Sequence, residues 1–354
     1  MKNKNELLKS VIPLICQWYE NNKKMLPWRN DPTPYHVWIS EIMLQQTRIE
    51  AVIPYYERFL SEFPTVASLA EASDERLMKL WQGLGYYSRA RNLKKAAQCV
   101  MNEYRGEIPD DAENLRKLPG IGEYTAGAIA SIAYHKPEPA VDGNVMRVIA
   151  RLIACEKDVM LPATRKAITE DLKKIYPKGV PAALLTEGLM ELGETICIPN
   201  GLPRCADCPL HKHCRAYIDG TVAQYPIRSP KKSRRIEEKT VFIFCCEGKY
   251  AIRKRPEKGL LAGMWEFCCI DGKLDLMERE RFLRKEGVGL VSLYSCGEAR
   301  HIFTHVEWHM SGYCVECLNQ TERYTWVAPE EIISSYAIPT AFRSFLQWIC
   351  EREI

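Results

Sequence analysis

The sequence predicts two kinds of structure in one chain, an all-helical part followed by a smaller α+β part. Apolar residues recur at helical spacing through most of residues 1–217, whereas β-branched and aromatic runs typical of strands begin at residue 240. The charged, proline-containing stretch 218–236 has no hydrophobic period, so we expect a linker there. A length of 354 residues also exceeds what one ordinary core holds. We therefore predict a multidomain protein.

The composition, 46% hydrophobic and 27% charged, is typical of a globular protein in water. No apolar run approaches the roughly 20 residues of a membrane span, and the N-terminus lacks a signal-peptide pattern. We expect a cytoplasmic monomer with no membrane partner. The net charge of +4 permits nucleic-acid binding without requiring it. Fifteen cysteines in such a chain favour free thiols, some of them metal ligands, over a disulfide framework.

The helical part predicts helices over residues 6–21, 35–47, 52–63 and 66–80, and further helices within 146–174 and 181–197. Between the first two, Leu26-Pro27-Trp28-Arg29 indicates an extended segment, in which we expect Trp28 to anchor packing.

Glu41 lies on an otherwise apolar face of the helix at 35–47. Val37 and Trp38 precede it by four and three residues, and Leu44 follows by three. A carboxyl held there is desolvated and its pKa rises, as a general acid near neutral pH requires. The alternative is a boundary glutamate that reaches solvent.

Two aromatic residues, Tyr86 and Tyr87, follow a pair of glycines and precede Arg89 and Arg91. They could pack against a helix end. Aromatic rings beside arginines also suit stacking on bases next to phosphate contacts. Gln46, at the end of a predicted helix, would otherwise be a solvated surface residue.

A glycine turn, Gly120-Ile121-Gly122, joins two predicted helices. Successive backbone N–H groups at such a turn can bind phosphate, although glycine turns join helices in many proteins. Further on, Asp142 could be the N-cap of the helix that begins near Asn144, where the helix N-terminus favours an ionised carboxylate.

Four cysteines, Cys197, Cys205, Cys208 and Cys214, lie within eighteen positions and include a C-x2-C pair. This density predicts a metal site. The spacing does not separate zinc from iron–sulfur, and the nearby His211 and His213 leave zinc open.

The α+β part predicts strands at 240–246, 250–255, 261–267 and 301–317, and a helix in 277–289. Within 301–317, alternation could place His301, His305 and His309 on one face of a single strand.

Together, the glycine turn, Val-Asp-Gly-Asn-Val at 141–145, WISEIMLQQT at 38–47 and the four cysteines resemble the helix-hairpin-helix DNA glycosylases with an iron–sulfur cluster. Within that superfamily the resemblance is to adenine DNA glycosylases of the MutY type, and it extends from about Leu26 into the C-terminal part. It implies an iron–sulfur helical domain (1–28 and 136–217), a helix-hairpin-helix domain (29–135), the linker (218–236) and a Nudix-like domain that reads 8-oxoguanine (237–354).

The resemblance also implies roles for individual residues. The catalytic set is Glu41 and Asp142, the latter oriented by Tyr124 and Asn144. A [4Fe–4S] cluster is implied on Cys197, Cys205, Cys208 and Cys214. The DNA-binding set is Gln46, Tyr86, Arg89, Gly120 and Gly122, with Gln46 probing the stack and Tyr86 intercalating. The residues that recognise a base are Trp28 and Arg29 at the adenine pocket, and Phe303, Thr304 and His305 at the oxidised base.

This chain departs from the family pattern at several positions. Tyr124 stands where relatives of the endonuclease III type carry a nucleophilic lysine, which favours base excision without strand cleavage. The first cysteine gap is seven residues instead of six, and the added residue falls in a proline- and glycine-containing loop that tolerates insertion. Thr304 replaces the family's serine and keeps the hydroxyl. Residues 277–289 do not reproduce the glutamates of an active Nudix hydrolase.

The function predicted from these features is monofunctional excision of adenine mispaired with 8-oxoguanine or guanine in double-stranded DNA. Two alternatives stay open. One is an endonuclease III-like glycosylase with lyase activity, against which Tyr124 and the C-terminal domain argue. The other is a non-catalytic iron–sulfur protein that binds damaged DNA, against which the presence of both Glu41 and Asp142 argues.

Overall fold

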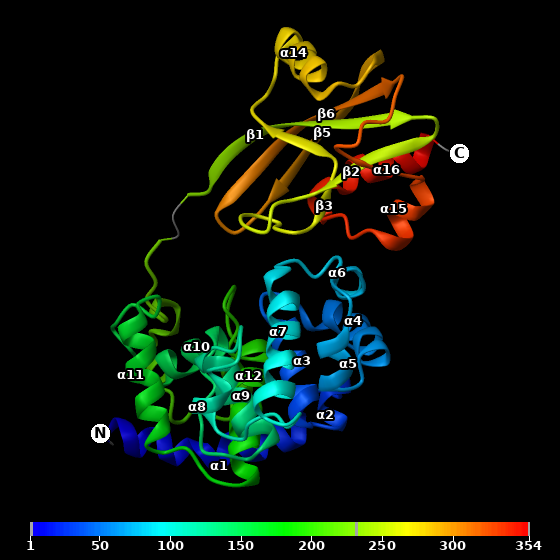
Figure 1. The fold of residues 1–354 in the computed structure, drawn as a ribbon. Helices are drawn as coiled ribbons and strands as arrows, with labels where there is room; N and C mark the ends of the chain where they lie inside the picture. The colour runs from blue at the N-terminus through cyan, green and yellow to red at the C-terminus, as the bar shows by residue number, and fades with distance from the viewer. Residues whose placement is uncertain (1–2, 231–232, 353–354) are drawn as a thin grey trace. The chain divides into compact units, whose positions relative to one another are not determined.

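A computed structural model describes residues 3–230 and 233–352, and the chain divides into two compact units (Figure 1). The helical unit comprises residues 1–71 and 92–230, and the sheet unit comprises residues 72–91 and 231–354. The predicted fold class, a helical core plus an α+β part, is confirmed. In the described part of the chain, no helix is both long and apolar enough to cross a membrane.

The helical unit is built from short helices joined by tight turns. Its helices, with α7 continuing from the sheet unit, are α1 (Lys4–Asn22), α2 (Pro27–Asn30), α3 (Pro34–Leu44), α4 (Ile49–Glu62), α5 (Val66–Glu71), α7 (Ser88–Glu103), α8 (Ala112–Leu115), α9 (Glu123–Ala128), α10 (Gly143–Leu152), α11 (Pro162–Lys173), α12 (Val180–Thr195) and α13 (Arg215–Ile218). A π-helical turn (Ile129–Ala133) follows α9, and 3-10 turns span Cys205–Asp207 and Val222–Gln224.

Helix α12 is the centre of the functional half of this unit, because α1 and α10 both pack on it. Two glycines permit the close approach. A Cβ added to Gly188 would lie 2.7 Å from Cγ2 of Ile15 in α1, and one added to Gly193 would lie 2.6 Å from Cβ of Asn144 in α10. Larger residues at these positions would push α12 away from both helices.

The sheet unit contains one seven-stranded mixed sheet, whose main path runs β3-β2-β1-β6-β5, with β4 paired to β1 and β7 to β2. Its strands are β1 (Arg235–Cys246), β2 (Lys249–Lys254), β3 (Trp265–Glu266), β4 (Cys268–Asp271), β5 (Leu290–Ile302), β6 (Val306–Cys317) and β7 (Thr325–Val327). Strands β1 and β6 are parallel, and β5 and β6 are antiparallel.

Helices cover both faces of this sheet (Figure 1). They are α14 (Leu276–Glu286), α15 (Pro329–Ser335) and α16 (Arg343–Arg352); a 3-10 turn spans Thr340–Phe342, and α6 (Asp74–Trp81) also belongs to this unit. Side chains alternate along β1, so Phe242 packs with Leu283 of α14 while Ile243 packs with Phe345 of α16.

The structure corrects several predictions. Residues Pro27–Asn30, which were expected to be extended, form the short helix α2, and only its N-cap Leu26 is extended. The single helix expected at 66–80 is interrupted, because Ser73 caps a new helix by accepting a hydrogen bond from the Arg76 amide at 3.2 Å. Helix α3 ends at Leu44, so Gln46 lies in a turn with φ of 60°. The strand expected at 301–317 is two strands joined by a turn at 303–305, and β5 was not predicted over most of its length. Strand β1 already begins at Arg235, inside the expected linker.

Candidate active site and cysteine loop

A pocket of about 560 Å³ opens among α3, α9, α10 and α12 of the helical unit. Its size is within the range of small-molecule sites. We call it the base pocket. Of the residues predicted from the sequence, those that line it are Trp28, Arg29, Glu41, Gln46, Tyr124, Asp142 and Asn144.

Glu41 is 6% exposed on α3, as its apolar neighbours predicted. The Tyr124 hydroxyl donates a hydrogen bond to Oε2 of Glu41. Burial raises the pKa of Glu41 from its ordinary value of 4.5 to about 7, the hydrogen bond from Tyr124 opposes that rise, and the charge of Asp142 adds to it. The Glu41 carboxyl can therefore hold and release a proton near neutral pH.

Tyr124 lies in the first turn of α9, directly after the glycine turn. Burial, and next the negative charge of Glu41, raise the pKa of the Tyr124 phenol well above its ordinary value. The phenol therefore stays protonated and acts as a donor to Glu41. This corrects the expectation that Tyr124 orients Asp142, whose carboxylate is bonded to Val145 and Asn144.

Asp142 is the N-cap of α10, and its position is fixed by hydrogen bonds. Oδ1 accepts from the Val145 amide at 2.7 Å, and Oδ2 accepts from Nδ2 of Asn144 at 3.0 Å. Burial nevertheless raises the pKa of Asp142 above its ordinary value, while these bonds lower it. The helix N-terminus favours the ionised form of Asp142, as predicted, but burial has the opposite and larger effect on its pKa.

A chain of hydrogen bonds leads from Asp142 to the first cysteine. Asn144, which donates to Asp142, accepts at Oδ1 from Nη2 of Arg147 at 2.7 Å. Nε of Arg147 in turn donates to the Cys197 carbonyl at 2.6 Å, and its Nη2 also donates to the Gly193 carbonyl at 2.8 Å. Arg147 thus connects the N-terminal turn of α10, which carries Asp142 and Asn144, to Cys197.

Three glutamates of α12 that were not predicted from the sequence, Glu187, Glu191 and Glu194, also line the base pocket. Arg29 donates from Nη2 to Oε2 of Glu191 at 2.8 Å, and its Nε lies 3.2 Å from Oε1 of Glu187. Glu191 is 2% exposed, and burial raises the pKa of Glu187. Glu187 and Glu191 lie one helical turn apart in a mostly apolar helix, but the residue that both of them bind, Arg29, lies about 160 residues away in the sequence. Trp28 packs edge-on against Tyr56 with ring centroids 5.4 Å apart, which fits the predicted packing role.

The glycine turn has the geometry of a helix-hairpin-helix connection between α8 and α9. Gly120 has φ of +79°, and an added Cβ would lie 2.6 Å from Cβ of Asn92, so only glycine fits without movement. Ile121 is buried, and Gly122 is the N-cap of α9 with open space beside it. Backbone N–H groups at this point are available to an anion.

The remaining predicted DNA-contacting residues lie in the sheet unit. Tyr86 is 46% exposed with φ of 46°, and its hydroxyl lies 2.6 Å from Oγ1 of Thr304. Thr304 and His305 are exposed in the β5–β6 turn, whereas the Phe303 ring packs 4.9 Å from that of Trp308. This turn therefore presents two side chains to solvent instead of continuing a strand.

Arg89 differs from the expectation of an exposed phosphate contact. It is 8% exposed, and its Nη2 donates to the carbonyls of Leu84 and Gly85 at 3.0 and 3.2 Å. Its guanidinium also lies 5.5 Å from the centre of the Tyr86 ring. In this conformation Arg89 supports the loop that carries Tyr86.

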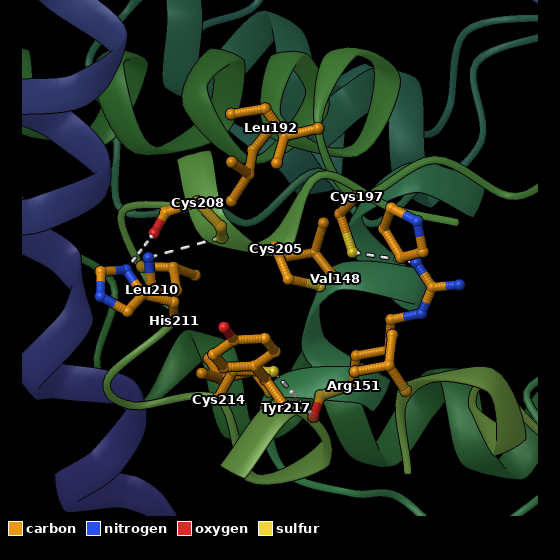
Figure 2. Close-up of a pocket in the computed structure, with 14 residues that line it drawn as sticks. Val148, Arg151, Leu192, Cys197, Cys205, Cys208, Leu210, His211, Cys214 and Tyr217 are labelled. Carbon is orange, nitrogen blue, oxygen red and sulfur yellow. Dashed lines mark hydrogen bonds between the residues drawn. The ribbon is translucent and has the colours of Figure 1, made fainter. Parts of the chain in front are cut away.

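The cysteine loop, residues 197–214, brings its four cysteines around one cavity (Figure 2). All four are free thiols, and apolar side chains such as Val148 and Leu192 complete the lining. The added residue of the seven-residue gap is accommodated in a closed loop: the Arg204 amide donates to the Ile196 carbonyl at 3.1 Å, and Gly201 has φ of +77°. Within the described residues, no group of three or more His, Cys, Asp or Glu side chains has the arrangement that holds a single metal ion.

Comparison with known proteins identifies the family. Residues 39–178 match the HhH-GPD superfamily of base excision DNA repair proteins, and residues 240–348 match the NUDIX domain. The chain is 32% identical to an adenine DNA glycosylase of Mus musculus over 396 positions, which cover 93% of this chain and 76% of that protein. The chain belongs to the adenine DNA glycosylase family. The resemblance drawn from the sequence motifs is thereby confirmed.

One further adenine DNA glycosylase and one solved structure extend the comparison. An adenine DNA glycosylase of Arabidopsis thaliana is 35% identical over 365 positions, covering 86% of this chain, which spans only 56% of that relative's length. A solved non-covalent endonuclease III–DNA complex is 25% identical with a TM-score of 0.52, covering 62% of this chain and 99% of that one. The helical fold is therefore shared with a protein whose structure contains DNA.

Proposed function

We propose that this protein is a monofunctional adenine glycosylase of base excision repair, which removes adenine opposite 8-oxoguanine or guanine in double-stranded DNA. Membership of the adenine DNA glycosylase family supports the reaction class. The single observation that carries the mechanism is the buried Glu41, with a pKa of about 7, in one pocket with Asp142. We further propose that it acts in the cytoplasm as a monomer.

In this mechanism the target nucleotide leaves the base stack and its adenine enters the base pocket. Glu41, protonated near neutral pH, donates its proton to N7 of adenine, so that the base departs without a full negative charge. Tyr124 holds the Glu41 carboxyl by its hydrogen bond. The ion pairs of Arg29 with Glu187 and Glu191 keep one wall of the pocket in place.

As the glycosidic bond breaks, positive charge develops on the sugar. The Asp142 carboxylate, fixed by Val145 and Asn144, stabilises this cation or traps it covalently. Water then completes the abasic site after one of the two carboxylates removes its proton. The arrangement is comparable to paired-carboxylate glycoside hydrolysis.

The absence of a lysine at position 124 supports excision without strand cleavage. A lyase needs an amine that attacks the sugar and forms a Schiff base. The residue at this place is Tyr124, whose phenol is a hydrogen-bond donor to Glu41.

Recognition of the opposite base is proposed to involve the sheet unit and the turn that follows α3. The exposed Thr304 and His305 supply polar contacts to 8-oxoguanine, with Phe303 beside them. Tyr86 enters the duplex, and Gln46, exposed at the mouth of the base pocket, probes the stack. Gly120 and Gly122 present backbone N–H groups to a phosphate.

We propose that Cys197, Cys205, Cys208 and Cys214 hold a [4Fe–4S] cluster. Four free thiols that line one largely apolar cavity support this assignment. The bound cluster would supply a rigid core for the loop, so that Arg204, Lys212 and Arg215 can contact DNA phosphates. Cys205→Ser should abolish the brown colour and visible absorbance of the purified protein and weaken DNA binding. A colourless wild-type protein that contains zinc would refute the assignment.

The experiment that tests the proposed reaction is single-turnover excision on duplexes with adenine opposite 8-oxoguanine, guanine or thymine, each read with and without alkali. We expect alkali-dependent cleavage of the two mispairs and none of the adenine–thymine duplex. Cleavage without alkali would support the endonuclease III-like lyase. Tight binding without cleavage would support a non-catalytic damage binder.

A further inference from the structure

One arginine outside the base pocket contacts three separate parts of the helical unit. Arg151, in the last turn of α10, is 6% exposed. Its Nη1 donates to Sγ of Cys197 at 3.2 Å and to the Ile198 carbonyl at 3.0 Å, and its Nε donates to the Tyr225 carbonyl at 3.0 Å. Its own carbonyl accepts from Sγ of Cys214 at 3.4 Å (Figure 2). A single residue thus joins α10, two of the four cysteines and the chain that follows the cysteine loop.

The segment that follows, residues 219–230, was expected to belong to a linker without structure. Residues 219–221 are instead bonded to α13, and the rest of the segment is held against the helical unit at three places. Besides the bond from Arg151 to Tyr225, the Val159 amide donates to the Ile227 carbonyl at 3.0 Å. The Ser229 amide donates to Oδ2 of Asp158 at 3.1 Å, and the Ser229 hydroxyl bonds to the same oxygen. These contacts fix the segment almost to the point where the sheet unit begins.

The bond from Arg151 to Cys197 depends on what the sulfur is bonded to. A cysteine that ligates a metal does so as a thiolate, and a thiolate accepts a hydrogen bond from a cationic guanidinium more strongly than a neutral thiol does. Because the guanidinium is planar and rigid, fixing Nη1 on Cys197 also fixes Nε on Tyr225. A loaded cysteine loop therefore strengthens the anchor of residues 219–230 through Cys197, whereas the bond that the Cys214 thiol donates to the Arg151 carbonyl exists only when Cys214 binds no iron.

We propose that Arg151 is a positioning residue that couples occupancy of the cysteine loop to the order of residues 219–230. The proposal rests on the proposed iron–sulfur cluster. Its consequence is that loss of the cluster loosens the chain that leads to the sheet unit, because the bond from Arg151 to Tyr225 weakens. Conversely, removal of Arg151 weakens retention of iron.

The test uses the full chain loaded with iron and sulfide, as wild type, Arg151→Met and Asp158→Asn. Two quantities are measured: the rate at which an iron chelator bleaches the visible absorbance, and hydrogen–deuterium exchange of peptides within 219–230. We expect Arg151→Met to release iron about tenfold faster, since a charge-assisted hydrogen bond is lost, and to exchange faster throughout the segment. Asp158→Asn is the matched control: exchange should rise near Ser229 while iron release stays at the wild-type rate.

Wild type stripped of iron should show the same faster exchange as Arg151→Met. The proposal is overturned if Arg151→Met releases iron at the wild-type rate, or if exchange within 219–230 is the same with and without iron. If Arg151→Met does not fold, Arg151→Lys takes its place, because it keeps the positive charge but lacks the planar guanidinium. It must release iron faster and exchange faster within 219–230. A lysine variant that matches wild type in both measurements overturns the proposal. A colourless wild type refutes the cluster itself, whereas a brown wild type with an unresponsive segment overturns only the coupling.

Discussion

Glutamates of the base pocket and of the sheet unit show opposite ways of holding a carboxyl. Glu41 is buried with a neutral phenol as its hydrogen-bond partner, and its pKa rises to about 7. Glu237 on β1 accepts from Nζ of Lys239 at 2.8 Å and from Nε1 of Trp308 at 3.0 Å, and the hydrogen bond from Lys239 is the main reason that its pKa falls to about 2. A carboxyl that is buried without a cationic partner has a raised pKa and can donate a proton near neutral pH. A carboxyl that is paired with a cation has a lowered pKa and stays ionised.

The difference gives the helical unit a carboxyl that titrates near neutral pH and the sheet unit carboxyls that stay ionised in ion pairs. In the sheet unit Glu266, 2% exposed, lies between Arg253 and Arg255, so its charge is also matched. Such pairs hold strands in place but are poor donors of a proton. In the base pocket Arg29 pairs with Glu191, and among the residues that the structure describes Glu41 forms no ion pair, although the charge of Arg29 lowers its pKa slightly.

The largest expected effect comes from removing the proton of Glu41. Glu41→Gln keeps the size of the side chain and an acceptor for Tyr124 but cannot donate a proton to adenine, so excision should slow by roughly 10²–10⁴-fold. Binding to a duplex with adenine opposite 8-oxoguanine should be retained. Single-turnover excision and equilibrium binding measure the two. Excision at the wild-type rate would remove Glu41 from the mechanism.

A somewhat smaller effect is expected at Asp142. Asparagine is as good an N-cap as aspartate, so Asp142→Asn should leave α10 and the melting temperature unchanged. It removes the charge that faces the developing cation, and excision should slow by roughly 10²–10³-fold. Thermal melting is the control for the cap. Full activity of this variant would show that the Asp142 charge is not used.

The stability of Glu41→Gln should depend on pH with a definite sign. Because the folded pKa of Glu41 lies above its ordinary value of 4.5, the folded state binds the proton more tightly, and wild type loses stability as pH rises from 4.5 through about 7. Above pH 7 this loss reaches about 3 kcal/mol, since one pKa unit corresponds to about 1.4 kcal/mol. Glu41→Gln should therefore be the more stable protein in alkaline buffer, an advantage that disappears below pH 4.5. Denaturant unfolding at both pH values would show it, and a pH-independent difference would contradict it.

Glu237→Gln in the sheet unit should show the opposite sign and a smaller size. The folded pKa of Glu237 lies below its ordinary value, so its stabilisation is present above pH 4.5 and is lost as pH falls toward 2. The side chain is 25% exposed, and solvent screening limits the effect to about 1 kcal/mol. Denaturant unfolding of wild type and of Glu237→Gln, near neutral pH and in acid, measures this difference in stability. A variant more stable than wild type at neutral pH would break the contrast between the units.

Much of the base pocket could be predicted because its signals are local. The apolar neighbours of Glu41 lie within one helical turn of it, and Asp142 caps a helix that starts at the next residue. The clamp on Arg29 by Glu187 and Glu191 could not be predicted in this way. It depends on α12 meeting a segment about 160 residues away, which the periodicity of either segment does not encode.

In the sheet unit the missed features were also non-local. Strand β5 is largely polar and partly exposed, so its stabilisation comes from pairing with β6 and not from its own apolar residues. The turn at 303–305 breaks an alternation that continues on both sides of it. The break between α5 and α6, in contrast, has a local signal. Ser73-Asp74-Glu75 is an N-cap sequence, but it lies within a continuous apolar period that predicted one helix.

The measurement that tests the central claim most directly is the pH dependence of excision by wild type at low substrate concentration, which reports the free protein. If the protonated Glu41 is the general acid, the rate should hold up to neutral pH and fall about tenfold per pH unit above about 7. In acid, the excision rate should fall once Asp142 becomes protonated. This fall should begin at a higher pH than it would for an ordinary aspartate, because burial raises the pKa of Asp142. A rate that stays constant or rises from neutral to alkaline pH would contradict the account, since Glu41 would then act without its proton.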